Sequence, residues 1–215
     1  SGDWSSDVCS SDLGESLIYP CFPGKVDSMT RLEEMLQANE AYCKNPPVDY
    51  TGEDVHESKL PKKKIAVFTC MDTRLVELLE PALGLKRGDA KFVKTVGNTL
   101  VGPFDGVVRS LMVATYELGI EEIFVVGHDE CGMAKTTAKS LIEAMHARGV
   151  DDAAIAPLRE ELVHWADSFS HPAENVKEVV RKLRENPLLP KDLKIHGLML
   201  HPRTGKVDLI ESGDA

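Results

Sequence analysis

The amino-acid sequence predicts an α/β fold: a central, mostly parallel β-sheet flanked by helices, with an antiparallel C-terminal edge hairpin and an N-terminal helical arm. Short apolar segments alternate with helical patterns of about ten to fifteen residues, which is typical of βαβ units. The first of these segments, Ile65–Cys70, is continuously apolar, as in a strand covered on both faces. Two short final segments joined by Pro202–Gly205 predict the edge hairpin.

The predicted elements follow one another without a change in composition, so we expect one domain over residues 28–215. Thr30 and Glu33 have the spacing of a capping box at the start of the helical arm, and Pro46 and Pro47 end it. The further helices are expected at 75–83, 104–118, 133–147, 152–169 and 173–185, and the strands at 65–70, 91–96, 122–127, 195–200 and 206–210.

Residues 1–27 differ from the rest of the chain. They contain two similar Ser-Ser-Asp tripeptides, at 5–7 and 10–12, and little apolar periodicity. Such a segment buries too little apolar surface to offset the entropy of ordering. We expect it to be disordered or not native to the domain.

The overall charge excludes several classes of partner. The chain has 25 Lys and Arg against 35 Asp and Glu, for a net charge of -10, which argues against a nucleic-acid or an anionic membrane surface as partner. No apolar run approaches the roughly 20 residues that span a bilayer. Five cysteines at irregular spacing do not form a disulfide framework, so we expect a cytoplasmic protein whose thiols are free for metal binding or catalysis.

Two loops carry the candidate chemistry, and each follows a predicted parallel strand. Cys70 to Arg74 follows the first strand, and His128 to Gly132 follows the third. Open α/β sheets bind ligands outside the carboxyl ends of neighbouring strands. If the first and third strands are neighbours, Cys70, His128 and Cys131 meet in one crevice. Two thiolates and one imidazole select Zn²⁺ and leave a fourth coordination position open.

Asp72 and Arg74 stand beside this ligand set, and three roles are open to Asp72. It can cap the short helix that begins near Thr73, occupy the fourth zinc position, or pair with Arg74 and leave that position open. In the open case, a hydroxide bound to zinc can attack a small electrophilic carbon, in hydration or hydrolysis. The loop from His128 to Gly132, called the metal loop below, contains two further acidic residues, Asp129 and Glu130, whose side chains we expect to face solvent.

The motif C-x-D-x-R, followed some sixty residues later by H-x-x-C-G, resembles the β-class carbonic anhydrases. The resemblance covers roughly Met29 to Glu211, and residues 70–79 are most similar to a small bacterial subgroup. It implies zinc-dependent, reversible hydration of carbon dioxide to bicarbonate and a proton, with Zn²⁺ on Cys70, His128 and Cys131. It also implies catalytic roles for Asp72 and Arg74, and a homodimer or dimer of dimers in which the helix at 29–43 wraps the partner subunit.

The sequence departs from the family pattern at two places that affect the substrate pocket. Pro61 stands where plant-type members have a Gln, and Thr95–Gly97 replaces an Asn-Ala-Gly found in many members. Two alternatives to carbon dioxide hydration stay open. One is hydrolysis of carbonyl sulfide or carbon disulfide on the same scaffold, and the other is a non-catalytic zinc protein with Asp72 as permanent fourth ligand.

Overall fold

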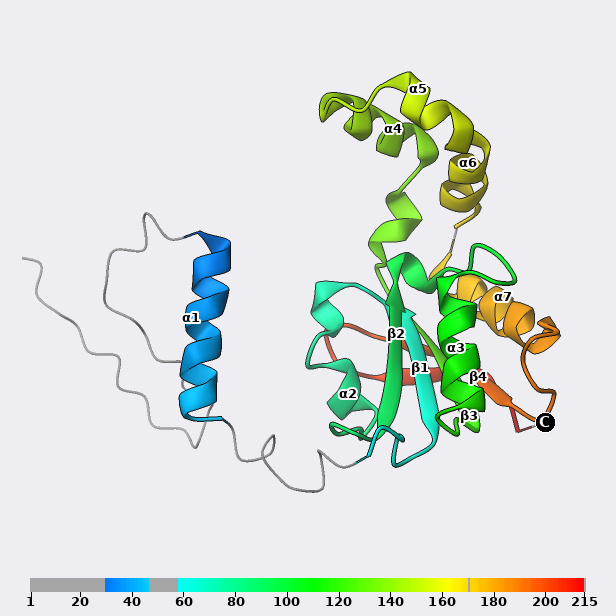
Figure 1. Ribbon diagram of the computed structural model, residues 1–215. Helices are drawn as coiled ribbons and strands as arrows, with labels where there is room; N and C mark the ends of the chain where they lie inside the picture. The colour runs from blue at the N-terminus through cyan, green and yellow to red at the C-terminus, as the bar shows by residue number, and fades with distance from the viewer. Residues whose placement is uncertain (1–29, 47–57, 170, 215) are drawn as a thin grey trace, which may run out of the picture. The chain divides into compact units, whose positions relative to one another are not determined.

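The computed structural model describes residues 30–46, 58–169 and 171–214 (Figure 1). The expectation for residues 1–27 lies outside these ranges. The chain divides into two compact units, residues 1–47 and 48–215, and each is described by itself.

The N-terminal unit contains one described helix, α1 (Arg31–Lys44). The Thr30 side chain accepts a hydrogen bond from the Glu33 amide, and the Glu33 carboxylate accepts one from the Thr30 amide at 2.8 Å, which confirms the predicted capping box. None of its residues is buried. Leu32 and Met35 are 65% and 70% exposed, so residues of this unit do not cover the apolar side chains of the helix.

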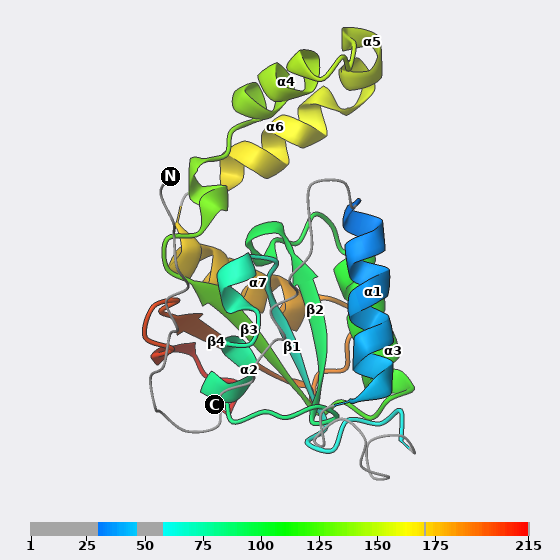
Figure 2. The same ribbon diagram turned by 90° about the vertical axis from the view of Figure 1, so that its left-hand side faces the viewer.

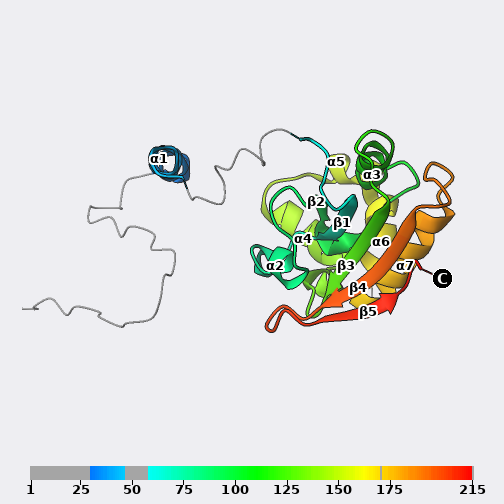
Figure 3. The same ribbon diagram turned by 90° about the horizontal axis from the view of Figure 1, so that it is seen from below.

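The second unit contains a five-stranded sheet, which confirms the predicted fold. Strand order is β2-β1-β3-β4-β5, as the view from below shows (Figure 3). The first four of these strands run parallel, and the last pairs antiparallel with β4, as expected of an edge hairpin. The strands are β1 (Ile65–Cys70), β2 (Ala90–Thr95), β3 (Glu122–His128), β4 (Lys194–Leu200) and β5 (Val207–Glu211).

The core lies on both faces of the sheet, which explains the continuous apolar run of β1. Ala66 and Phe68 pack on the face covered by α3 (Gly106–Tyr116) and α7 (Pro172–Glu185). Val67 packs on the opposite face, in a second buried cluster. Since successive side chains of a strand point to opposite faces, a strand covered on both faces has no polar positions in its middle.

Three of the predicted helices are interrupted. Glu77 adopts a left-handed backbone with φ of 59°, which breaks the predicted helix 75–83. Thr137 caps a new helix within 133–147. Pro157 lacks an amide hydrogen and breaks 152–169. The resulting pieces are η3 (Thr73–Leu75), α2 (Leu79–Ala82), η5 (Gly132–Lys135), α4 (Ala138–Ala147), α5 (Asp152–Ile155), η6 (Ala156–Leu158) and α6 (Arg159–Ser168).

The helices α4 and α6 lie side by side beyond the carboxyl ends of the parallel strands (Figures 1 and 2). They therefore rise from the edge of the sheet at which the predicted site residues follow their strands. Within the described ranges, no helix is both long and apolar enough to cross a bilayer.

Candidate metal centre

The three predicted ligands meet at the carboxyl ends of two neighbouring strands. Cys70 is the last residue of β1 and His128 the last of β3, and these strands pair directly. Strand β2 lies on the other side of β1, so the strand order reverses at β1, where open α/β sheets bind ligands. Cys131 follows in the turn after β3. All three side chains are buried, and their potential ligand atoms lie within 4.8 Å of one another.

The distances and the chemistry of this cluster fit a zinc ion. The Sγ atoms of Cys70 and Cys131 are 3.9 Å apart. Tetrahedral zinc with two Zn–S bonds of about 2.3 Å places its sulfurs about 3.8 Å apart. Among the described residues, His128 Nε2 is buried without a hydrogen-bond partner, as expected of a nitrogen that faces a metal position. The cluster is therefore a candidate metal centre.

A backbone hydrogen bond fixes the orientation of the His128 ring. Its Nδ1 lies 2.9 Å from the Asp129 carbonyl oxygen, and because a carbonyl only accepts, Nδ1 carries the proton. The lone pair of the neutral ring is then on Nε2, toward the sulfurs. Burial by itself lowers the pKa of His128, but the neighbouring Cys70 sulfur and the Asp129 carbonyl raise it overall.

When no cation is present, the two cysteine thiols differ in pKa. The hydrogen bond with Cys131 lowers the pKa of Cys70 below its ordinary value, although burial opposes this shift. The same hydrogen bond, together with burial, raises the pKa of Cys131. One thiolate therefore forms readily and the second does not. A bound cation displaces the second proton, since metal binding to cysteine pairs releases protons.

Gly97 provides a further contact to the cluster that the sequence analysis did not assign. Its amide donates to Cys70 Sγ at 3.3 Å. Gly97 has a φ of 59°, and a Cβ there would lie 3.0 Å from side-chain atoms of Met133 and Phe169. Only glycine fits this close approach. Pro61, the other departure from the family pattern, precedes β1 at the opposite end of that strand from Cys70.

Asp72 is held by Arg74 through both carboxylate oxygens. Its Oδ1 accepts from Arg74 Nε at 3.0 Å and from the Arg74 amide at 2.9 Å, while Oδ2 accepts from Nη2 at 2.9 Å. The amide contact also caps η3, so the capping and pairing roles occur together. Hydrogen bonds from Arg74 lower the pKa of Asp72 to about 2. Asp72 Oδ2 lies 3.7 Å from His128 Nε2, so an ionised carboxylate stands beside the metal position.

Glu130 does not simply face solvent, in contrast to the expectation. Its side chain is 56% exposed, but its carboxylate contacts Arg74 Nη1 at 3.3 Å and Arg203 Nη2 at 3.3 Å. Its carbonyl accepts from Arg74 Nη2 at 2.9 Å. Attraction to Arg203 is the main cause that lowers the pKa of Glu130. Because Arg203 lies 73 residues further along the chain, no local spacing indicated this contact.

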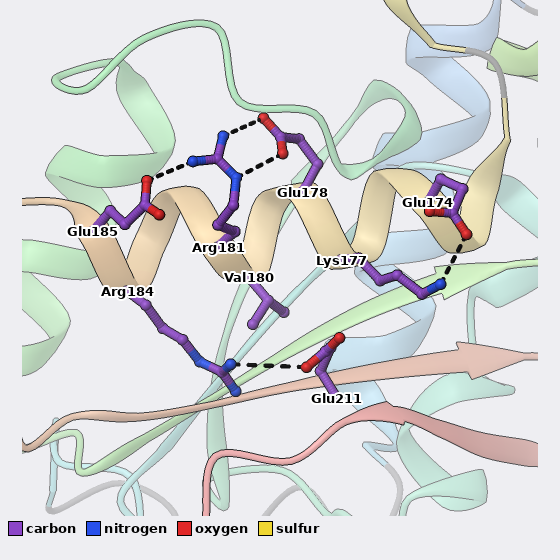
Figure 4. Close-up of a pocket in the computed structure, with 8 residues that line it drawn as sticks. All are labelled: Glu174, Lys177, Glu178, Val180, Arg181, Arg184, Glu185 and Glu211. Carbon is purple, nitrogen blue, oxygen red and sulfur yellow. Dashed lines mark hydrogen bonds and ion pairs between the residues drawn. The ribbon is translucent and has the colours of Figure 1, made fainter. Parts of the chain in front are cut away.

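Two surface hollows in the second unit lie apart from the cluster. The first, of about 580 Å³, lies over α7 and β5 (Figure 4). Its cations are all paired with acidic neighbours, since Lys177 binds Glu174, Arg184 binds Glu211, and Arg181 binds two glutamates of its own helix. The second, of about 530 Å³, lies between the segment at 99–101 and helices α6 and α7. Neither is lined by a candidate ligand.

Comparison with known proteins gives a consistent result. The model of the carbonic anhydrase family matches residues 65–207. The chain is 41% identical over 191 residues to the Bacillus subtilis protein YvdA, which its name assigns provisionally to the carbonic anhydrases, with 87% of this chain and 95% of that protein covered. It is 29% identical over 154 residues to a carbon disulfide hydrolase of Acidithiobacillus thiooxidans, with 66% of this chain and 75% of that protein covered.

Among solved structures, the chain is similar to the β-carbonic anhydrase TvaCA1 of Trichomonas vaginalis. The TM-score is 0.80 and the identity 43%, over 86% of this chain and all of that chain. A carbonic anhydrase from Streptococcus mutans gives a TM-score of 0.63 at 29% identity, over 85% of this chain and 99% of that chain. The family match and these relatives together show that the chain belongs to the β-class carbonic anhydrases, a family of enzymes.

Proposed function

We propose that the chain binds Zn²⁺ through Cys70, His128 and Cys131 and catalyses the reversible hydration of carbon dioxide to bicarbonate and a proton. The observation that carries this proposal is the buried Cys-His-Cys cluster with an Arg-held carboxylate 3.7 Å from the imidazole. Zinc bound by two thiolates and an imidazole supplies a Lewis acid and lowers the pKa of a coordinated water.

The chain's own residues supply orientation. Oδ1 of Asp72 is occupied by two donors of Arg74, whereas Oδ2 has one donor from Arg74 and faces the cluster. Oδ2 can therefore accept a hydrogen bond from the attacking water and direct the lone pair of that water toward the substrate carbon. The fork of Arg74 also holds the carboxylate away from the metal position, so that Asp72 does not become a ligand.

The second candidate function is hydrolysis of carbon disulfide or carbonyl sulfide at the same site. It is favoured by the similarity to a protein named carbon disulfide hydrolase. The ligand set does not separate the two reactions, because all three substrates are linear molecules with an electrophilic carbon. The shape of the substrate pocket decides between them.

The proposal predicts an order of turnover for the three substrates. Zinc-quantified protein should hydrate carbon dioxide well above the buffer rate, and should turn over carbonyl sulfide and carbon disulfide more slowly. Stopped-flow measurement of carbon dioxide hydration, with assay of released hydrogen sulfide for the other two, tests this order. Zinc-loaded protein with no carbon dioxide hydration above buffer would refute the proposal, and faster carbon disulfide turnover would support the alternative.

We also propose that the active form is a homodimer or a dimer of dimers. The exposed apolar side chains of α1, which include Leu32, Met35 and Leu36, need a covering surface. A second copy of the chain provides one, as the β-class resemblance implies for this helical arm. Analytical ultracentrifugation at micromolar concentration should give twice or four times the 23.6 kDa chain mass. A monomer that retains full activity would contradict this assembly.

A further inference from the structure

The guanidinium of Arg74 is bound on two sides, and only one of them is Asp72. Its Nε and Nη2 donate to the Asp72 carboxylate. Its Nη1 donates to a Glu130 carboxylate oxygen at 3.3 Å, and Nη2 also donates to the Glu130 carbonyl at 2.9 Å. A guanidinium is planar and rigid, so contacts on its far side fix the orientation of the side that faces Asp72.

Glu130 stands in the loop between two candidate ligands, His128 and Cys131. Its φ of 55° lies in the left-handed region, which is unfavourable for a residue with a side chain. In this conformation, both its carbonyl and its carboxylate contact the same guanidinium. Glu130 therefore links the metal loop after β3 to the Asp72–Arg74 loop after β1.

Arg203 holds Glu130 from a third segment. It lies in the turn between β4 and β5, and its Nη2 is 3.3 Å from both carboxylate oxygens of Glu130. The charges alternate in sign from Arg203 through Glu130 and Arg74 to Asp72. Each exposed pair in such a row stabilises the fold only slightly, so its main effect is on side-chain orientation.

We propose that Glu130 is a positioning residue, anchored by Arg203, that keeps Arg74 on Asp72 and so keeps the fourth metal position accessible. This inference rests on the proposed metal site. When the Glu130 carboxylate is lost, Arg74 keeps its bond to the Glu130 carbonyl but loses the ion pair at Nη1, which loosens its hold on Asp72. Asp72 then competes for the metal position.

The test compares two variants of the same loop in cobalt-substituted protein. Glu130→Gln removes the ion pairs, whereas Asp129→Asn removes an equal charge at the preceding residue, whose side chain makes no hydrogen bond or ion pair to Arg74 within the described residues. Thiocyanate is titrated into each protein, and its binding at the metal is followed in the visible cobalt spectrum. Loss of a negative charge by itself strengthens anion binding. Weaker binding therefore reports closure of the site.

In Glu130→Gln we expect the thiocyanate dissociation constant to rise about tenfold. This is the rise expected if Asp72 leaves the metal position open in only about one tenth of the molecules. Cobalt content should stay at one ion per chain, and Asp129→Asn should bind thiocyanate at least as tightly as wild type. Because loss of a positive charge weakens anion binding by itself, Arg203→Met, at a side chain 74% exposed, should raise the dissociation constant more than Lys206→Met, which removes an equal charge from the same turn. This comparison provides a second measurement if Glu130→Gln fails to fold.

A double-mutant cycle separates this role from a general loop effect. If Glu130 acts through Arg74, Glu130→Gln should add nothing to the effect of Arg74→Ala. Unchanged thiocyanate binding in Glu130→Gln, or an equal effect in the Arg74→Ala background, would overturn the inference. The readout needs no turnover, so wild type that binds thiocyanate but does not hydrate carbon dioxide refutes only the proposed function. Wild-type cobalt protein that binds no thiocyanate refutes the open site and the inference with it.

Discussion

Arg74→Ala is expected to lower kcat/KM for carbon dioxide hydration by about 100-fold or more while zinc stays near one ion per chain. The substitution removes both side-chain donors to Asp72 and leaves only the backbone amide on Oδ1. Oδ2 already lies 3.7 Å from His128 Nε2, so the freed carboxylate would compete for a metal held by the cluster. The fourth position is then occupied by protein. Stopped-flow rates with metal analysis of the same sample test this result.

Arg74→Lys is the matched control for the charge. Lysine keeps the positive charge but replaces a two-point fork with a single donor group, so we expect an intermediate rate. An Arg74→Ala enzyme as active as wild type would contradict the role of Arg74 in keeping the site open. Zinc loss from Arg74→Ala would instead show that Arg74 supports the metal loop. A wild-type zinc form with Asp72 already bound to the metal would favour the non-catalytic zinc protein.

The sheet and the core of the site could be predicted from sequence because both depend on short-range patterns. The continuously apolar run ending at Cys70 indicated a buried parallel strand, and parallel strands bring their carboxyl ends to one edge. The structure confirms that β1 and β3 are neighbours, which places Cys70 beside His128 and Cys131. Asp72 and Arg74 are two residues apart, so local spacing was enough to include their pairing among the three roles open to Asp72.

The contacts that could not be predicted join segments far apart in the chain. Glu130 meets Arg203 only because β4 lies next to β3 and the turn after β4 reaches the metal loop. Gly97 reaches Cys70 because the segment after β2 folds back over the end of β1. In the sequence, a single glycine is typical of a turn and does not indicate which distant residue it contacts. The break at Glu77 escaped prediction because helical patterns are averaged over a window, and one left-handed residue does not change that average.

Removal of the metal is expected to abolish activity altogether. Without a cation, the cysteine pair retains a proton, and the Lewis acid that would activate water beside Asp72 is missing. Zinc should restore the rate, because two soft thiolates and an imidazole match its preferences. Magnesium at the same concentration should not, because it prefers six oxygen ligands.

The most direct test of this account is therefore a zinc titration of metal-free protein, with carbon dioxide hydration measured by stopped flow at each step. The account predicts no rate above buffer at the start. It then predicts a linear rise with added zinc that ends at one ion per chain, and no rise with magnesium. Hydration by the metal-free protein, or protein with one bound zinc per chain and no rate above buffer, would contradict it.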